Sequence, residues 1–190
     1  TIPVSNADHY GVLDVTYTGE NGASYTTPEF TNEYSAEGKG FVEVAKHLAS
    51  LLLVPGTYSF TVSAIANAEG KNAPMLGADF QPIDSKFLTV TNAEDGEKVA
   101  FPDFWYKLDE AGTEYIYKIT EDAYDEHVTE GVSRDIKNGP AVIYAKVIVG
   151  ADQHNGTLKD AEVFYYKDAE CKQPLDKPEY VNKYNTAKES

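Results

Sequence analysis

The amino-acid sequence predicts an all-β fold, a β-sandwich with one long irregular insertion. The 190 residues include 14 Tyr and 8 Phe, and aromatic residues, like Val and Thr, suit the half-buried surface of a pleated sheet. Short segments of alternating apolar and polar residues recur along the chain, with Gly, Asn, Asp and Pro between them. No segment of useful length has a helical period, and this combination is typical of a β-sandwich.

The first predicted strands form a hairpin near the N-terminus. Residues 12–17 are rich in β-forming residues and are followed by Asn21-Gly22, a pair that favours a tight turn. A second short strand is expected at residues 30–34, so residues 10–34 are predicted to form one hairpin. After this hairpin, the sequence Gly38-Lys39-Gly40 is expected to interrupt the regular secondary structure.

Two further segments alternate clearly enough for their faces to be assigned. One row of side chains consists of Val42, Val44, Lys46 and Leu48, and the other of Tyr115, Tyr117, Ile119 and Glu121. The remaining strands are expected at residues 57–64, 87–90, 98–101, 104–108, 141–149, 161–166 and 180–184. Residues 65–98 are otherwise irregular and form the insertion. The apolar run at residues 49–54 is compatible with a single helical turn or with a buried strand.

Composition and charge exclude several classes of function. The formal net charge is −15, a field that repels nucleic acid and anionic membranes, so we expect neither as a partner. The sequence contains no signal peptide and no apolar segment of membrane length. The one cysteine, Cys171, lies in a polar stretch, where an incidental loop thiol is a more ordinary interpretation than a nucleophile. The histidines and acidic residues follow no metal-binding spacing, so we expect no metal and no cofactor.

A short motif occurs twice and indicates a modular chain. The pentapeptide Phe30-Thr31-Asn32-Glu33-Tyr34 returns as Tyr180-Val181-Asn182-Lys183-Tyr184, an aromatic residue, any residue, Asn, any residue and Tyr. Internal repeats are a mark of modular arrays. The chain is therefore predicted to hold one whole module and the end of a preceding one, with Asn32 and Asn182 at the same point of each last strand.

Three polar residues lie where the strand pattern predicts the interior: Lys46, Glu121 and Asn182. Burial lowers the pKa of a lysine and raises that of a carboxyl group. A neutral Lys46 amine can attack the side-chain carbonyl of Asn182, while a protonated Glu121 hydrogen-bonds that carbonyl and then moves protons as ammonia leaves. The product is a Lys–Asn isopeptide crosslink, formed once per molecule. The ordinary interpretation is a lysine that reaches solvent, a surface glutamate and an asparagine that caps a turn.

The order of several motifs resembles the isopeptide-forming domains of Gram-positive pilin shafts and surface adhesins, the streptococcal pilin backbone type related to the CnaB fold. The resemblance covers about residues 37–186 and implies an Ig-like β-sandwich in which Lys46 bonds to Asn182 and Glu121 is the catalyst. The insertion is longer than expected for that family, and Tyr180 stands where Phe is commoner. The motifs are Gly40-Phe41-Val42-Glu43-Val44-Ala45-Lys46, Gly56-Thr57-Tyr58-Ser59-Phe60, Gly96-Glu97-Lys98-Val99-Ala100-Phe101, Tyr115-Ile116-Tyr117-Lys118-Ile119-Thr120-Glu121 and the closing pentapeptide.

The resemblance also implies a division of the chain. Residues 1–36 are expected to be the terminal hairpin of a preceding module or an inter-domain segment, residues 37–186 the isopeptide-forming domain, and residues 187–190 a linker to a next module. Asn32 would then be the crosslinking residue of the preceding module, with its lysine partner before Thr1. The alternative is that Asn32 competes with Asn182 for Lys46.

The function that the resemblance implies is structural. We expect a stalk or shaft module of an extracellular, cell-wall-anchored adhesin or pilus, whose partners are neighbouring modules of the same polypeptide. An amide crosslink resists reduction, which suits a chain with a single cysteine. A second hypothesis is a ligand-binding adhesin module that contacts a host glycan or protein through its insertion and exposed tyrosines. A turnover enzyme is least favoured, because the reaction would consume its own residues.

Overall fold

The computed structural model describes residues 17–25, 32–122, 131–135 and 137–184. The chain divides into two compact units, Thr1–Tyr34 and Ser35–Ser190.

The first unit contains a hairpin that is shorter than the sequence predicts. Strands β1 (Tyr17–Thr18) and β2 (Ser24–Tyr25) pair antiparallel. The predicted Asn-Gly turn is confirmed, since Gly22 has φ 79° and the Asn21 side-chain oxygen accepts a hydrogen bond from the Ala23 backbone N–H at 3.1 Å. The predicted second strand at residues 30–34 is wrong in its described part, because the tight turn returns the chain at Ser24 and residues 32–34 form no strand. Residues 12–16, 30 and 31 lie outside the described part of the chain.

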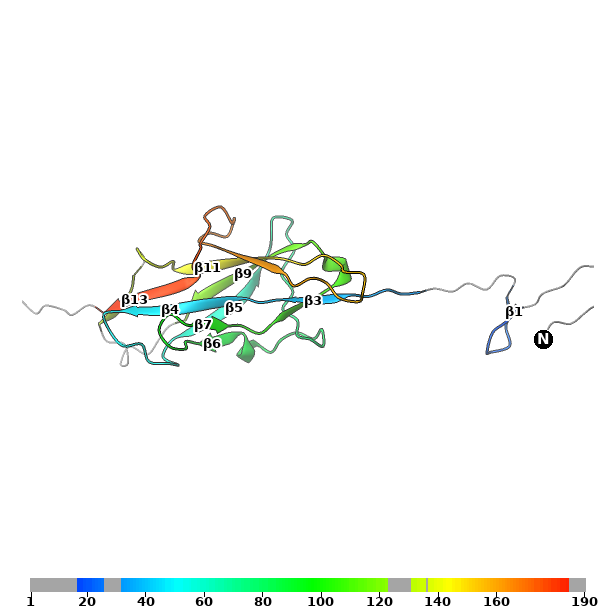
Figure 1. The fold of residues 1–190 in the computed structure, drawn as a ribbon, viewed down its shortest axis with the longest axis horizontal. Helices are drawn as coiled ribbons and strands as arrows, with labels where there is room; N and C mark the ends of the chain where they lie inside the picture. Colours follow the sequence, from blue (N-terminus) through cyan, green and yellow to red (C-terminus); the bar gives the residue numbers. More distant parts are fainter. Residues whose placement is uncertain (1–16, 26–31, 123–130, 136, 185–190) are drawn as a thin grey trace, which may run out of the picture. The chain divides into compact units, whose positions relative to one another are not determined.

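The second unit is a β-sandwich, which confirms the predicted all-β fold (Figure 1). One sheet has the order β10-β13-β4-β7, and the facing sheet has the order β12-β11-β9-β5-β6. The strands of the first sheet are β4 (Glu43–Ala49), β7 (Lys98–Ala100), β10 (Val132–Arg134) and β13 (Glu179–Tyr184). Those of the second are β5 (Ser59–Ile65), β6 (Thr89–Thr91), β9 (Glu114–Glu121), β11 (Val142–Ile148) and β12 (Glu162–Tyr166).

Both predicted inward rows are confirmed and form opposite walls of the core. The row on and just before β4 consists of Val42, Val44, Lys46 and Leu48, and the row on β9 of Tyr115, Tyr117, Ile119 and Glu121; all eight residues are buried. Aromatic rings fill the space between the sheets. The rings of Phe104 and Tyr117 stack with their centroids 4.5 Å apart, an arrangement that contributes beyond the apolar area it buries.

Gly38 and Gly40 lie within a strand, so the predicted interruption of regular structure at these glycines is wrong. Strand β3 (Glu37–Gly40) pairs with β8 (Phe104–Lys107) as a small antiparallel sheet. A Cβ atom at Gly38 would lie 2.7 Å from the Leu158 Cβ, and one at Gly40 would lie 3.2 Å from the Val147 Cγ1. These glycines therefore permit a close approach of chain segments, the other common reason for glycine in a strand.

The insertion and the apolar run before it are mostly irregular. Residues 65–98 contain a 3-10 turn, η1 (Ser85–Phe87), and strand β6, which lies one to two residues later than the predicted strand at residues 87–90. A second 3-10 turn, η2 (Leu108–Glu110), follows β8. In the run at residues 49–54, Ala49 ends β4, and residues 50–54 form neither a helical turn nor a strand: Leu53 is buried, whereas Leu52 is 82% exposed.

The pairing of β13 with β4 determines the position of the candidate site. These two strands, far apart in the sequence, lie side by side and run parallel (Figure 1). Tyr180 lies opposite Lys46, and Asn182 lies opposite Leu48. Side chains two residues apart share a face of a strand, so Lys46 and Asn182 both face the interior, toward β9.

Candidate functional site

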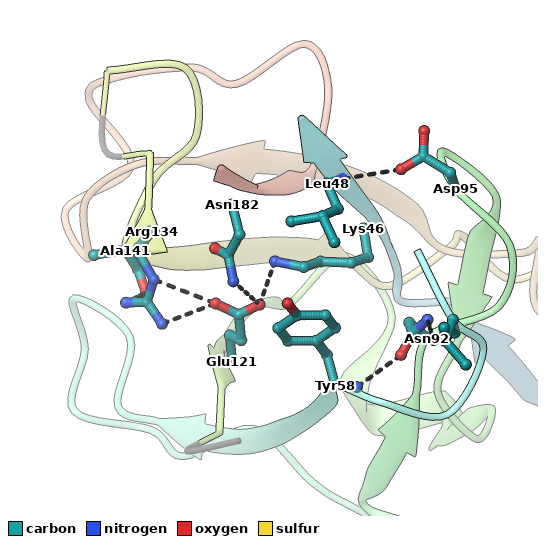
Figure 2. Close-up of polar contacts among 10 residues, drawn as sticks. Lys46, Leu48, Tyr58, Asn92, Asp95, Glu121, Arg134, Ala141 and Asn182 are labelled. Carbon is teal, nitrogen blue, oxygen red and sulfur yellow. Dashed lines mark hydrogen bonds and ion pairs between the residues drawn. The ribbon is translucent and has the colours of Figure 1, made fainter. Parts of the chain in front are cut away.

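Lys46, Glu121 and Asn182 meet inside the sandwich (Figure 2). Lys46 comes from β4, Asn182 from the neighbouring β13 and Glu121 from the last residue of β9 in the facing sheet. Lys46 and Asn182 have 0% of their surface exposed and Glu121 has 7%. The sequence pattern thus located three polar residues that share one enclosed site.

One oxygen of Glu121 contacts both nitrogens of the site. The Lys46 Nζ lies 2.5 Å from the Glu121 Oε1, and the Asn182 Nδ2 donates to the same oxygen at 3.4 Å. The amide nitrogen of Asn182, and not its carbonyl oxygen as expected from the sequence, therefore faces Glu121. The buried Asn182 Oδ1 has no hydrogen-bond partner among the described residues.

The surroundings of Lys46 shift its titration toward the neutral form. Burial lowers the pKa of Lys46, and the nearby Glu121 carboxylate opposes this shift only in part. The Lys46 Nζ lies 4.3 Å from the centroid of the Tyr58 ring. Asn92 holds Tyr58 in place, because its Oδ1 accepts from the Tyr58 backbone N–H at 2.7 Å while its Nδ2 donates to the Val54 carbonyl at 3.0 Å.

Tyr180, the aromatic residue of the closing motif, attaches β13 to the facing sheet. Its hydroxyl donates to the Ile119 carbonyl at 2.7 Å and accepts from the Ile143 backbone N–H at 3.3 Å. Its ring centroid lies 5.3 Å from that of Phe60. A phenylalanine would supply the ring but not the hydroxyl bonds, so the tyrosine helps to hold Asn182, two residues later, against β9.

Arg134 is a site residue that the sequence reasoning missed. It lies on β10, opposite Asn182 in the sheet. Its Nη2 and Nε donate to the Glu121 Oε2 at 3.1 and 3.3 Å, and its Nη1 donates to the Ala141 carbonyl at 3.3 Å. Residues 122–140 carry no clear strand pattern, but one signal was available, since Arg134 is the only arginine among the 16 basic residues.

The other candidate residues lie apart from this site. Asn32 belongs to the first unit, where it is exposed and outside any strand. Cys171 is a half-buried loop residue, and burial raises the pKa of its thiol, which disfavours a nucleophilic thiolate. No cluster of His, Cys, Asp and Glu suited to a metal ion occurs in the described part of the chain. Within the same residues, no helix has the length and apolar character needed to cross a membrane.

Comparison with known proteins identifies the family. The model of the FctA family, described as a Spy0128-like isopeptide-containing domain, matches residues 42–185. The chain belongs to this family. The matched range contains Lys46, Glu121 and Asn182, and the predicted relationship to pilin-type isopeptide domains is confirmed. The family is one of structural domains and not of enzymes.

The chain is also similar to solved structures of a streptococcal pilin. The major pilin of Streptococcus pyogenes matches with a TM-score of 0.40 and 16% identity over 82% of this chain and 52% of the pilin chain. A point mutant of that pilin matches with a TM-score of 0.42 and 13% identity over the same shares. The chain thus spans about half the length of these pilin chains. No curated protein matches it.

Proposed function

We propose that this chain is a shaft or stalk module of a Gram-positive surface protein and that it forms its own Lys46–Asn182 isopeptide bond. The observation that carries the proposal is the contact of one buried carboxylate oxygen, Glu121 Oε1, with both the Lys46 Nζ and the Asn182 Nδ2. These are the two nitrogens that exchange places on a carbonyl carbon in such a reaction.

The reaction balances with these three side chains alone. The neutral Lys46 Nζ attacks the Asn182 Cγ, and a C–N bond forms. Glu121 Oε1 takes one proton from Nζ and delivers it to Nδ2, so that the Cγ–Nδ2 bond breaks and ammonia leaves. Glu121 ends in its starting protonation state, and the product is a secondary amide between Lys46 and Asn182.

The packing of the site supports this slow chemistry. An amine and a carboxamide react sluggishly in water, but fixing them in one geometry raises their effective concentration by several orders of magnitude. Lys46 and Asn182 are fully buried and come from adjacent strands. The tertiary fold therefore holds the reactants together for the lifetime of the folded state.

The position of the bond suits a structural role. β4 lies near the start of the second unit and β13 is the last of its described strands. A covalent bond between these two neighbouring strands of one sheet would transmit a pulling force from one end of the domain to the other without pulling β4 and β13 apart. We accordingly propose an extracellular, cell-wall-anchored location, with neighbouring modules of the same polypeptide as partners.

The intact mass of the purified chain tests the proposal. We expect a mass lower than the sequence mass by one ammonia, with the loss absent from Lys46→Ala, Asn182→Ala and Glu121→Ala. Lys98→Ala is the matched control, because Lys98 is an exposed lysine paired with Glu43 on the same sheet, and this variant should retain the loss. An unmodified mass in both fresh and aged wild-type protein would contradict the crosslink.

A further inference from the structure

We propose that Arg134 is a positioning residue for the crosslinking reaction, one that holds Glu121 by Oε2 and leaves Oε1 to serve Lys46 and Asn182. This inference rests on the proposed function and adds a fourth side chain to the three that the sequence indicates. Arg134 contacts neither reacting nitrogen in the described structure, so it acts through Glu121.

The geometry divides the two oxygens of Glu121 between two tasks. Two nitrogens of Arg134 bind Oε2 at 3.1 and 3.3 Å, whereas the Lys46 Nζ and the Asn182 Nδ2 bind Oε1 at 2.5 and 3.4 Å. A guanidinium group is planar and presents its N–H groups in a fixed fork, so it fixes the orientation of the carboxylate that it binds. Figure 2 shows the carboxylate between Arg134 on one side and the two reacting side chains on the other.

Arg134 is itself held in place by the sheet. Its Nη1 donates to the Ala141 carbonyl, which anchors the far side of the guanidinium group. Its backbone on β10 lies opposite Asn182 on β13. β13 therefore carries Asn182, whose amide nitrogen leaves, and also pairs with the strand that carries Arg134. Arg134 in turn holds Glu121, the group that carries the proton.

The charge of Arg134 also acts on the nucleophile. Burial is the largest cause of the lowered pKa of Lys46, and the positive charge of Arg134 contributes in the same direction. Asp95 and Glu121 oppose it, since both are acidic. The groups around the Lys46 amine are Glu121 from β9, Arg134 from β10, Asp95 from the loop before β7 and the ring of Tyr58 before β5. Because the attack requires the neutral amine, the rate should rise with pH as Lys46 loses its proton.

Neutralising Arg134 should change both the rate and its pH dependence. Chain prepared in denaturant, and shown by intact mass to be still uncrosslinked, is diluted into refolding buffers between about pH 5 and pH 9 and followed by intact mass for the loss of ammonia. In Arg134→Gln we expect the reaction to be about 10- to 100-fold slower at neutral pH, because the proton carrier is less well positioned. The rising part of the profile should also move to higher pH, because the contribution of the Arg134 charge to the lowered pKa of Lys46 is gone, while burial still lowers it.

Arg134→Lys separates positioning from charge. A lysine keeps the positive charge but cannot bind Oε2 through two nitrogens of one rigid group. We therefore expect this variant to react more slowly than the wild type while its profile rises in the same pH range. Lys137→Gln is the matched control, since it removes an exposed charge three residues away and should leave rate and profile unchanged.

The outcomes distinguish this inference from the function on which it rests. If the refolded wild type loses no ammonia, the crosslink itself is wrong and the role of Arg134 fails with it. If the wild type reacts and Arg134→Gln has the same rate and pH profile, only the role of Arg134 is overturned. A slower reaction with an unchanged profile in both variants, accompanied by a lower melting temperature, would make Arg134 merely structural and would also overturn it. If circular dichroism shows that Arg134→Gln does not fold, Arg134→Lys decides: a wild-type rate, or a slower reaction with a lower melting temperature, contradicts the inference, and a slower reaction in the same pH range with an unchanged melting temperature supports it.

Discussion

The two copies of the aromatic-x-Asn-x-Tyr motif differ completely in their surroundings. Asn182 lies on β13, fully buried, with its amide against Glu121 and with Lys46 one strand away. Asn32 lies in the first unit, exposed and outside any strand. The motif is therefore insufficient to define a reactive asparagine, which also requires a lysine and a carboxylate brought to it by other strands.

The comparison also shows what makes the second copy different. Tyr180 places β13 against β9 and β11 through its hydroxyl, and the parallel pairing with β4 places Asn182 near Lys46. The residues that decide reactivity thus come from distant parts of the sequence. An isolated pentapeptide carries none of these contacts.

The largest expected effect is the loss of folding stability when Asn182, the buried asparagine of the second motif copy, is replaced. Asn182→Ala removes the proposed bond between residues 46 and 182, and in the chain-entropy model a loop of this length stabilises the fold by roughly 5 kcal/mol. For a domain of this size, that loss should lower the melting temperature by roughly 10–20 °C. Scanning calorimetry of the wild type and the variant measures the difference.

Lys46→Met is the partner experiment, because it keeps an unbranched apolar stem of similar length at the same position but supplies no amine. Its melting temperature should be close to that of Asn182→Ala. A melting temperature within a few degrees of the wild type in both variants would show that no covalent bond stabilises this unit.

The sequence was sufficient for much of the fold but only for part of the site. The alternating rows ending at Lys46 and Glu121 could be assigned because each strand has one face in the core, and a polar residue in such a row is conspicuous. Gly38 and Gly40 were assigned to a break because a close approach between distant segments leaves no local signal. Arg134 was missed for a related reason: its strand has only three residues, and its role depends on β9 and β13.

A smaller effect should appear in the pH dependence of the uncrosslinked fold. In Asn182→Ala, Lys46 keeps its amine, and burial holds its pKa in the folded state below the ordinary 10.5. Between the lowered folded pKa and the unfolded value the unfolded chain binds more protons, so stability should rise with pH on the alkaline side, up to the onset of tyrosine titration. Urea unfolding at a series of pH values measures this slope.

The double variant Lys46→Met/Asn182→Ala provides the reference for that slope, since it keeps every other titrating group. Its stability should rise less over the same range. The range ends below pH 10 because burial raises the pKa of tyrosines such as Tyr165, to about 12, and their titration then acts in the opposite direction. Parallel slopes in the two proteins would contradict a lowered pKa at Lys46.

The smallest expected effect is at the exposed copy of the motif. Asn32→Ala should leave both the loss of ammonia and the melting temperature of the second unit unchanged, because Asn32 is exposed and belongs to the other unit. If Asn32 instead competed for Lys46, Asn182→Ala would still lose one ammonia, and this loss would disappear only in Asn32→Ala/Asn182→Ala. Peptide mapping of the three variants separates these cases, since each crosslink joins the Lys46 peptide to a different partner. A peptide that joins Lys46 to Asn32 would show that the asparagine of this motif can react with a lysine without the buried position that Asn182 has on β13. The proposed difference in reactivity between the two copies would then be wrong.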